Sequence, residues 1–243
     1  AWLHSFEANL RRDQRRFPEA LKSIERALAV DDGELRGKIL ISKANILSAC
    51  GDIEGSAAAL EAAAPLVDAL REPRLALVLR FNLLEDLCQL GRAEEAAPRL
   101  AEVRMLAERL GETLDLARVV WLSGKVFAGL GRAADARAAF EQVRQEFRHH
   151  QLAYDAALVH LDLSLLLLDE GRTGEVRQIA EEMLWIFQAQ GVRREALIAL
   201  GVFCEAARRE TATTELVRKV FRFLRRAELD VGLRFDEEGD EAS

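Results

Sequence analysis

The chain has 243 residues, of which 50% are hydrophobic and 31% charged, so enough apolar surface is present for a folded core and disorder is excluded. The formal net charge is −7, and six acidic residues against one arginine follow Glu228, so the body is close to neutral and lacks the basic surface typical of nucleic-acid binding. Cys50, Cys88 and Cys204 have neither C-x-x-C spacing nor an even count, which argues against a disulfide framework or a zinc site and fits a reducing, cytoplasmic compartment.

The predicted elements are helices from end to end, because strand-like alternation is missing and Gly and Pro fall mostly between apolar helical stretches. A glycine recurs every 40 residues, at Gly51, Gly91, Gly131 and Gly171. Arg15 takes this place 36 residues before Gly51, and Thr211 takes it on the 40-residue step after Gly171. The pattern predicts six helical hairpins over residues 1–228, followed by an acidic C-terminal tail over residues 229–243.

Each glycine suits the end of a helix, where a left-handed residue lets the chain turn. An acidic residue follows four places later, at Glu95, Asp135, Glu175 and Glu215, in the first turn of the next helix, where the helix dipole favours negative charge. Pro65 is predicted to kink or break its helix, whereas Pro98 lies near a helix start and is tolerated.

These hairpins resemble tetratricopeptide repeats. Residues 17–28, FPEALKSIERAL, are close to the second helix of that family, and Gly124-x-x-Phe127 followed by Ala136-x-x-x-Phe140 matches its small–aromatic and alanine–aromatic spacings. Small residues recur at the position where the family has glycine: Ala8, Ala44, Gly124, Ser164 and Cys204. Leu84, at the same position of the third repeat, departs from this pattern. The usual repeat has about 34 residues, and a period near 40 also suits HEAT-type repeats. Long units of this kind resemble those of bacterial multi-domain regulators, including peptide-pheromone receptors.

The resemblance implies an all-α, right-handed α-solenoid whose first helices line a binding groove. Carrying the family's groove positions onto this sequence predicts partner-binding residues of mixed amide, charged and aromatic character: Asn9, Lys38, Asn45, Phe81, Asn82, Glu85, Arg118, Trp121 and Lys125. Trp121 has the alternative of being a core residue. Ser5 and Ile41 lack the lysine with which the family's chaperone clamps begin, so a chaperone C-terminus is not expected as ligand. The last two repeats are apolar at these positions, and Leu158, Leu161, Leu165, Leu168 and Ile198 form either a ligand groove or core.

No motif for catalysis, metal binding or a cofactor is found. His149 and His150 are adjacent at a predicted turn, no phosphate-binding loop or nucleophile elbow is present, and no apolar run is long enough to span a membrane. The basic amphipathic stretch from Leu216 to Arg226 has two interpretations. It is either a surface that binds membranes, acidic partners or nucleic acid, or a helix that caps the repeat array with a polar outer face.

We therefore expect a protein- or peptide-binding scaffold or sensor region, not an enzyme, from a larger bacterial protein. The alternative is the ligand- or peptide-sensing domain of a transcriptional regulator, whose DNA-binding domain would precede Ala1. In both cases nucleic acid is not expected to bind this region directly.

Overall fold

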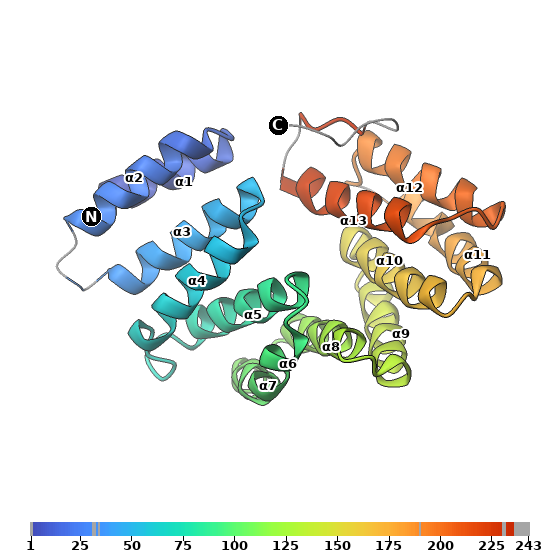
Figure 1. Cartoon of the computed structure of the whole chain (residues 1–243), viewed down its shortest axis with the longest axis horizontal. Helices are drawn as coiled ribbons and strands as arrows, with labels where there is room; N and C mark the ends of the chain where they lie inside the picture. The colour runs from blue at the N-terminus through green and yellow to red at the C-terminus, as the bar shows by residue number, and fades with distance from the viewer. Residues whose placement is uncertain (1, 31–32, 34, 190, 230–231, 236–243) are drawn as a thin grey trace. The chain divides into compact units, whose positions relative to one another are not determined.

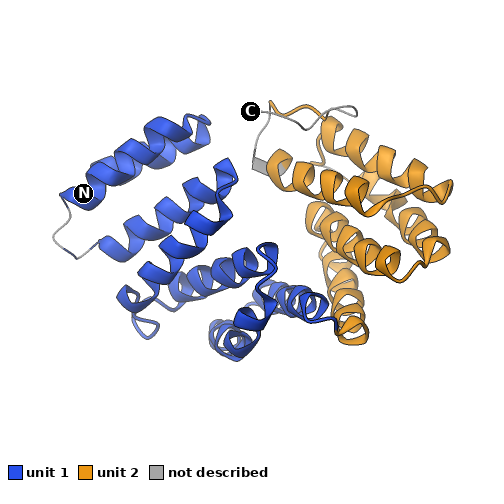
Figure 2. Cartoon of the chain, in the orientation of Figure 1, with its two compact units in different colours: residues 1–131 blue, residues 132–243 orange. Residues whose placement is uncertain are grey.

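The computed structural model describes residues 2–30, 33, 35–189, 191–229 and 232–235, and within them every regular element is a helix. The all-α class predicted from the sequence is confirmed. The chain divides into two compact units, residues 1–131 and residues 132–243 (Figure 2).

The first unit is a run of helical hairpins (Figure 1). Its helices are α1 (Trp2–Asp13), α2 (Phe17–Ala29), α3 (Arg36–Cys50), α4 (Ile53–Ala63), α5 (Pro73–Gln89), α6 (Ala93–Ala96), α7 (Leu100–Leu110) and α8 (Thr113–Gly129). Helix α1 packs on α2, α3 on α4, and α5 on α7. Pro65 lies in a short 3₁₀ turn, Ala64–Leu66, that ends α4 as predicted. Pro98 has a larger effect than expected, because a second 3₁₀ turn, Ala97–Arg99, divides the expected helix into α6 and α7.

The second unit contains α9 (Ala133–His149), α10 (Ala153–Asp169), α11 (Thr173–Glu182), the 3₁₀ helix Met183–Gln188, α12 (Arg194–Arg208) and α13 (Thr214–Leu229). Helix α10 packs against α9, α11 and α13. Because it has neighbours on several sides, Leu158 and Leu161 are buried, with exposures of 3% and 0%, and they form core. Of the other residues of the predicted apolar groove, Leu165 and Leu168 are half-buried and Ile198 is 38% exposed. The two helices of the fourth predicted hairpin, α8 and α9, belong to different units.

Left-handed residues end the helices at the predicted turns. Gly51 has φ 92°, its amide donates to the carbonyl of Ser48 (3.1 Å), and the amide of Asp52 donates to that of Leu47 (2.9 Å). The same pair of hydrogen bonds recurs where Gly91 and Gly171 occupy the turn. Three turns use residues other than glycine, namely Arg15 (φ 58°), Gln151 (φ 56°) and Glu210 (φ 57°).

The last of these turns corrects the sequence register. The 40-residue step placed the turn residue at Thr211, whereas the left-handed residue is Glu210, and the amide of Thr211 donates to the carbonyl of Ala206 (2.9 Å). The hydrogen-bonding pattern is the same as at Gly51, with the left-handed residue one place earlier. The step from Gly171 to Glu210 is therefore 39 residues, and no glycine marks its end in the sequence.

At three of its four positions the recurring acidic residue pairs with an arginine three places before it, whereas Ala212 takes that place before Glu215. Arg92 Nε donates to Glu95 Oε1 (2.6 Å), and this hydrogen bond lowers the pKa of the Glu95 carboxyl. Arg132 and Asp135 form the same pair, with Nη2 and Oδ2 2.7 Å apart. Arg92 also contacts Glu54 of the preceding hairpin (3.2 Å). The arginine therefore joins one helix start to its neighbour, a role that the helix-dipole argument did not predict.

Two glycines three residues apart allow a test of the turn conformation. Gly171 has φ 71°, Gly174 lies within α11, and a Cβ added at either position meets no atom within 4 Å. Gly171→Ala should lower the free energy of unfolding by about 1 kcal/mol, because only the left-handed backbone opposes the methyl group. Gly174→Ala should raise it by up to about 0.5 kcal/mol, because this residue of the first helical turn has an ordinary backbone conformation and alanine restricts the unfolded chain.

Urea unfolding of both variants followed by circular dichroism measures the two changes. If both substitutions shifted the midpoint in the same direction, the left-handed turn would not control the stability of this hairpin.

Candidate functional site

All nine predicted partner-binding residues belong to the first unit, on α1, α3, α5 and α8. Four of these residues occupy the same position in successive first helices, and we call them the central row: Asn9, Asn45, Glu85 and Lys125. The residue immediately before each of them is buried, even where Leu84 replaces a small side chain: Ala8, Ala44, Leu84 and Gly124. The four helices thus share one register, which makes these side chains equivalent positions of successive repeats.

Two members of the row contact each other. Lys125 Nζ on α8 lies 2.5 Å from Glu85 Oε1 on α5, and the two side chains are 12% and 10% exposed. The same ammonium lies 4.2 Å from the ring centroid of Trp121, which is 4% exposed. We call Glu85, Trp121 and Lys125 the Glu85 cluster. Burial of the ion pair strengthens its attraction but carries a desolvation cost, so each charge depends on the other.

Another buried polar contact lies next to this cluster. The hydroxyl of Ser56 on α4 donates to Asp86 Oδ2 on α5 (2.6 Å), and Asp86 is 4% exposed. Glu85 and Asp86 are consecutive, so α5 carries two buried carboxylates that are bound to different helices. Sequence reasoning missed Asp86, because nothing in the pattern distinguishes a buried aspartate from a solvated one.

The other predicted residues are more open. Asn9, Asn45 and Asn82 are half-buried, and no hydrogen-bond partner for their side-chain amides is found in the described part of the chain. We call these three residues the amide set. An amide offers both donors and an acceptor, so each of them can still bind a peptide group. Lys38 pairs with Glu72 at 2.5 Å, and both side chains are substantially exposed. Phe81 is half-buried against the core of the unit, and Arg118 is exposed.

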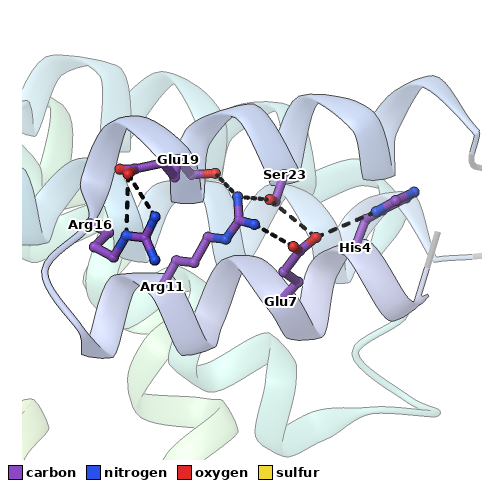
Figure 3. A network of polar contacts seen from close by, with 6 residues as sticks. All are labelled: His4, Glu7, Arg11, Arg16, Glu19 and Ser23. Carbon is purple, nitrogen blue, oxygen red and sulfur yellow. Dashed lines mark hydrogen bonds and ion pairs between the residues drawn. The ribbon is translucent and has the colours of Figure 1, made fainter.

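A polar network fixes the hairpin that carries Asn9 (Figure 3). On α1, Arg11 donates to Glu7 Oε1 (2.5 Å) and, across to α2, to the hydroxyl of Ser23 (3.2 Å) and the carbonyl of Glu19 (3.3 Å). Ser23 is completely buried, so this arginine connects the interior of the hairpin to its surface. The network orients α1, and with it the position of Asn9, and no motif in the sequence indicated it.

The groups that often carry chemistry are placed elsewhere. Burial raises the pKa of Cys204 to about 11 and lowers that of His160 to about 4, so both are neutral at pH 7. Cys50 is exposed and Cys88 is half-buried. His149 and His150 are exposed at the end of α9, as the predicted turn requires. Over the described residues, no group of three or more His, Cys, Asp or Glu side chains could hold a metal ion.

No helix among the described residues is long and apolar enough to cross a membrane.

No family model and no curated protein matches the chain, but solved structures do. A Rap protein complexed with competence and sporulation factor has a TM-score of 0.69 at 16% identity, over 93% of this chain and 64% of that one. RapI in its apo form has a TM-score of 0.71 at 11% identity, over 92% and 82%. Aspartyl phosphate phosphatase F from Bacillus subtilis has a TM-score of 0.69 at 14% identity, over 93% and 61%. The chain thus spans less than two thirds of the first and third of these proteins, and the likeness shows an all-α fold of tetratricopeptide-like repeats.

The Glu85 cluster predicts a large difference between two ion pairs of equal length. Lys125→Met should lower the free energy of unfolding by about 3 kcal/mol, because it leaves the Glu85 carboxylate buried without its cation. Lys38→Met removes an exposed pair of the same 2.5 Å length and should cost less than about 1 kcal/mol. Combining Glu85→Met with Lys125→Met should recover much of the loss, since no unpaired charge remains.

Chemical denaturation of the three variants measures these values. An equally small loss for Lys125→Met and Lys38→Met would mean that water reaches the Glu85 carboxylate.

Proposed function

We propose that the first unit binds an extended peptide or a peptide segment of a partner protein, and that α1, α3 and α5 provide most of the contacts. The observation that carries the proposal is the amide set, since Asn9, Asn45 and Asn82 are half-buried without a hydrogen-bond partner in the described part of the chain. Half-buried amides with no partner in the protein keep their donors and acceptor accessible, so a ligand can bind them in place of water.

The chemistry of the set favours a peptide backbone over other ligands. An asparagine amide can accept from a backbone N–H and donate to a backbone carbonyl at the same time. Lys38, which pairs with Glu72, and Arg118 are exposed cations at predicted groove positions of α3 and α8, which suits a ligand with an acidic side chain or a free carboxylate. Phe81 provides a half-buried aromatic surface for one apolar side chain.

The Glu85 cluster has a supporting role in this proposal. Trp121 is 4% exposed with Lys125 over its ring, so it offers a ligand little surface. Glu85 and Lys125 neutralise each other at the same row position that Asn9 and Asn45 occupy in the preceding repeats. We infer that the pair fixes α5 against α8 and thereby positions Asn82, one helical turn before Glu85, for the ligand.

The similar structures are compatible with a binding role. The Rap protein was solved in complex with competence and sporulation factor, so in that protein the same fold is associated with a bound molecule. We propose that the protein is a non-catalytic, cytoplasmic scaffold or sensor of bacterial type. The comparisons do not favour the alternative of a sensing domain in a transcriptional regulator.

The proposal can be tested with peptides selected from a displayed library of random linear sequences of about 12 residues, with the intact chain as the target. The affinities of the selected peptides can then be measured. Asn45→Ala and Asn82→Ala should each weaken binding of a selected peptide about tenfold, because each removes roughly 1.4 kcal/mol of hydrogen bonding. The melting temperature should change little, since neither amide has a partner to lose within the described residues.

Gln142→Ala is the matched control, because Gln142 is an exposed amide on α9 in the second unit. If the selected peptides bound all three variants as tightly as the unchanged chain, the amide set would not be the binding site.

A further inference from the structure

Helix α13 carries a row of arginines that the proposed peptide site does not use. Arg218, Arg222 and Arg226 are four residues apart, so they lie along one side of the helix, and all three are exposed. None of them forms an ion pair with a described residue. We call these three residues the arginine row. Arg92 and Arg172, by contrast, pair with nearby carboxylates. Exposed arginines without an ion pair among the described residues also occur singly elsewhere, as at Arg148, but the arginine row brings three of them to one side of one helix.

Neither helix capping nor the helix dipole explains the whole row. Arg226 lies in the last turn of α13, where the dipole favours a cation. Arg218 lies near the N-terminal end of the helix, where the dipole opposes a cation, and Arg222 lies between the two. A polar outer face on a terminal helix requires charge, but it does not require charge of one sign. The row is therefore complementary to an acidic segment.

The chain returns to α13 after the helix ends. The ring of Phe235 meets that of Phe223 edge to face, with centroids 5.0 Å apart, and Lys219 Nζ lies 5.6 Å from the centroid of Phe235. The amide of Phe235 donates to Glu195 Oε2 on α12 (3.2 Å). Phe235 is thus held by contacts to both α12 and α13. Its contact residue Phe223 directly follows Arg222 in the sequence.

The residues that follow Phe235 have the complementary charge. Asp236, Glu237, Glu238, Asp240 and Glu241 supply five carboxylates within six residues, all outside the described part of the chain. Six extended residues reach about 20 Å, whereas the arginine row covers about 12 Å of helix axis. Since Phe235 is fixed beside the row, the acidic residues have a high effective concentration there without any binding partner.

We propose that the arginine row is a docking surface and that its occupant is the acidic segment 236–241 of the same chain. The segment neutralises a row that would otherwise attract other anions, and an external acidic protein that binds α13 must first displace it. This inference does not depend on the peptide site of the first unit, because it concerns a different helix and a different ligand chemistry.

Lys219 makes the contact measurable in the intact chain. A carbodiimide joins an ammonium directly to a neighbouring carboxylate, so docking should give crosslinks from Lys219 to residues 236–241, detected by mass spectrometry after digestion. The local crosslink from Lys219 to Glu215, one helical turn away, is the reference for lysine reactivity. Raising the ionic strength from about 0.1 M to about 1 M shortens the Debye length from about 10 Å to about 3 Å and should reduce the long-range crosslinks relative to this reference.

Reversing charges in the row distinguishes specific docking from proximity alone. Arg218→Glu combined with Arg222→Glu should lower the normalised crosslinks roughly fivefold, because two attractions become repulsions. Arg148→Glu, an exposed arginine on α9, should leave them unchanged. Crosslinks that are absent, insensitive to salt, or equally strong in the double variant would overturn the proposal. Crosslinks found only between isotopically labelled and unlabelled chains would assign the row to a second copy instead.

Discussion

A single left-handed residue at the end of a helix is the constraint on which the repeat architecture depends. At Gly51, Gly91 and Gly171 the turn amide and the following amide donate to carbonyls of the last helical turn, which satisfies groups that would otherwise lack partners and reverses the chain. The next helix then begins at a fixed point, which an arginine and a glutamate three residues apart mark after Gly91 and Gly171 and which the Asp52 cap marks after Gly51. Because the turn recurs at nearly constant spacing, equivalent residues of successive first helices fall at the same height.

That regular placement brings two kinds of residue into one row. In α5 and α8 the row carries Glu85 and Lys125, which neutralise each other while largely buried, and in α1 and α3 it carries Asn9 and Asn45, whose amides remain available. A buried ion pair adds little net stability compared with well-packed apolar residues, but it strongly disfavours any arrangement that separates the charges. We interpret the pair as a device that sets the register of α5 against α8, and the amides as the part of the row that a ligand can use.

Much of the fold could be predicted from the sequence, because its signals are local. Glycine at 40-residue intervals marked the turns, and small residues such as Ala44 and Gly124 marked the close helix contacts. Failures occurred where the signal is not local. Glu210 adopts a left-handed conformation with no glycine to indicate it, and Pro98 divides a helix that its position near the N-terminus was expected to preserve.

The candidate site was less predictable than the fold for the same reason. The sequence selected Glu85, Trp121 and Lys125 as separate positions. Helical spacing of four residues allows the contact between Trp121 and Lys125, but nothing in the sequence indicated that Lys125 pairs with Glu85, 40 residues away. Burial of a charged side chain depends on which residue lies opposite it, and that is a property of the packed helices. Membership of the amide set in a binding surface remains a prediction.

The location of a bound peptide tests the central claim most directly. A selected peptide carrying a photoreactive benzoyl-phenylalanine is bound to the intact chain, irradiated, and mapped by mass spectrometry. The account predicts crosslinks on α3 and α5, close to residues 38–45 and 78–82, with no loss of helix content. Crosslinks confined to the second helices of the hairpins, α2, α4 and α7, or to residues 132–243, would contradict the assignment of the peptide site to the face that carries the amide set.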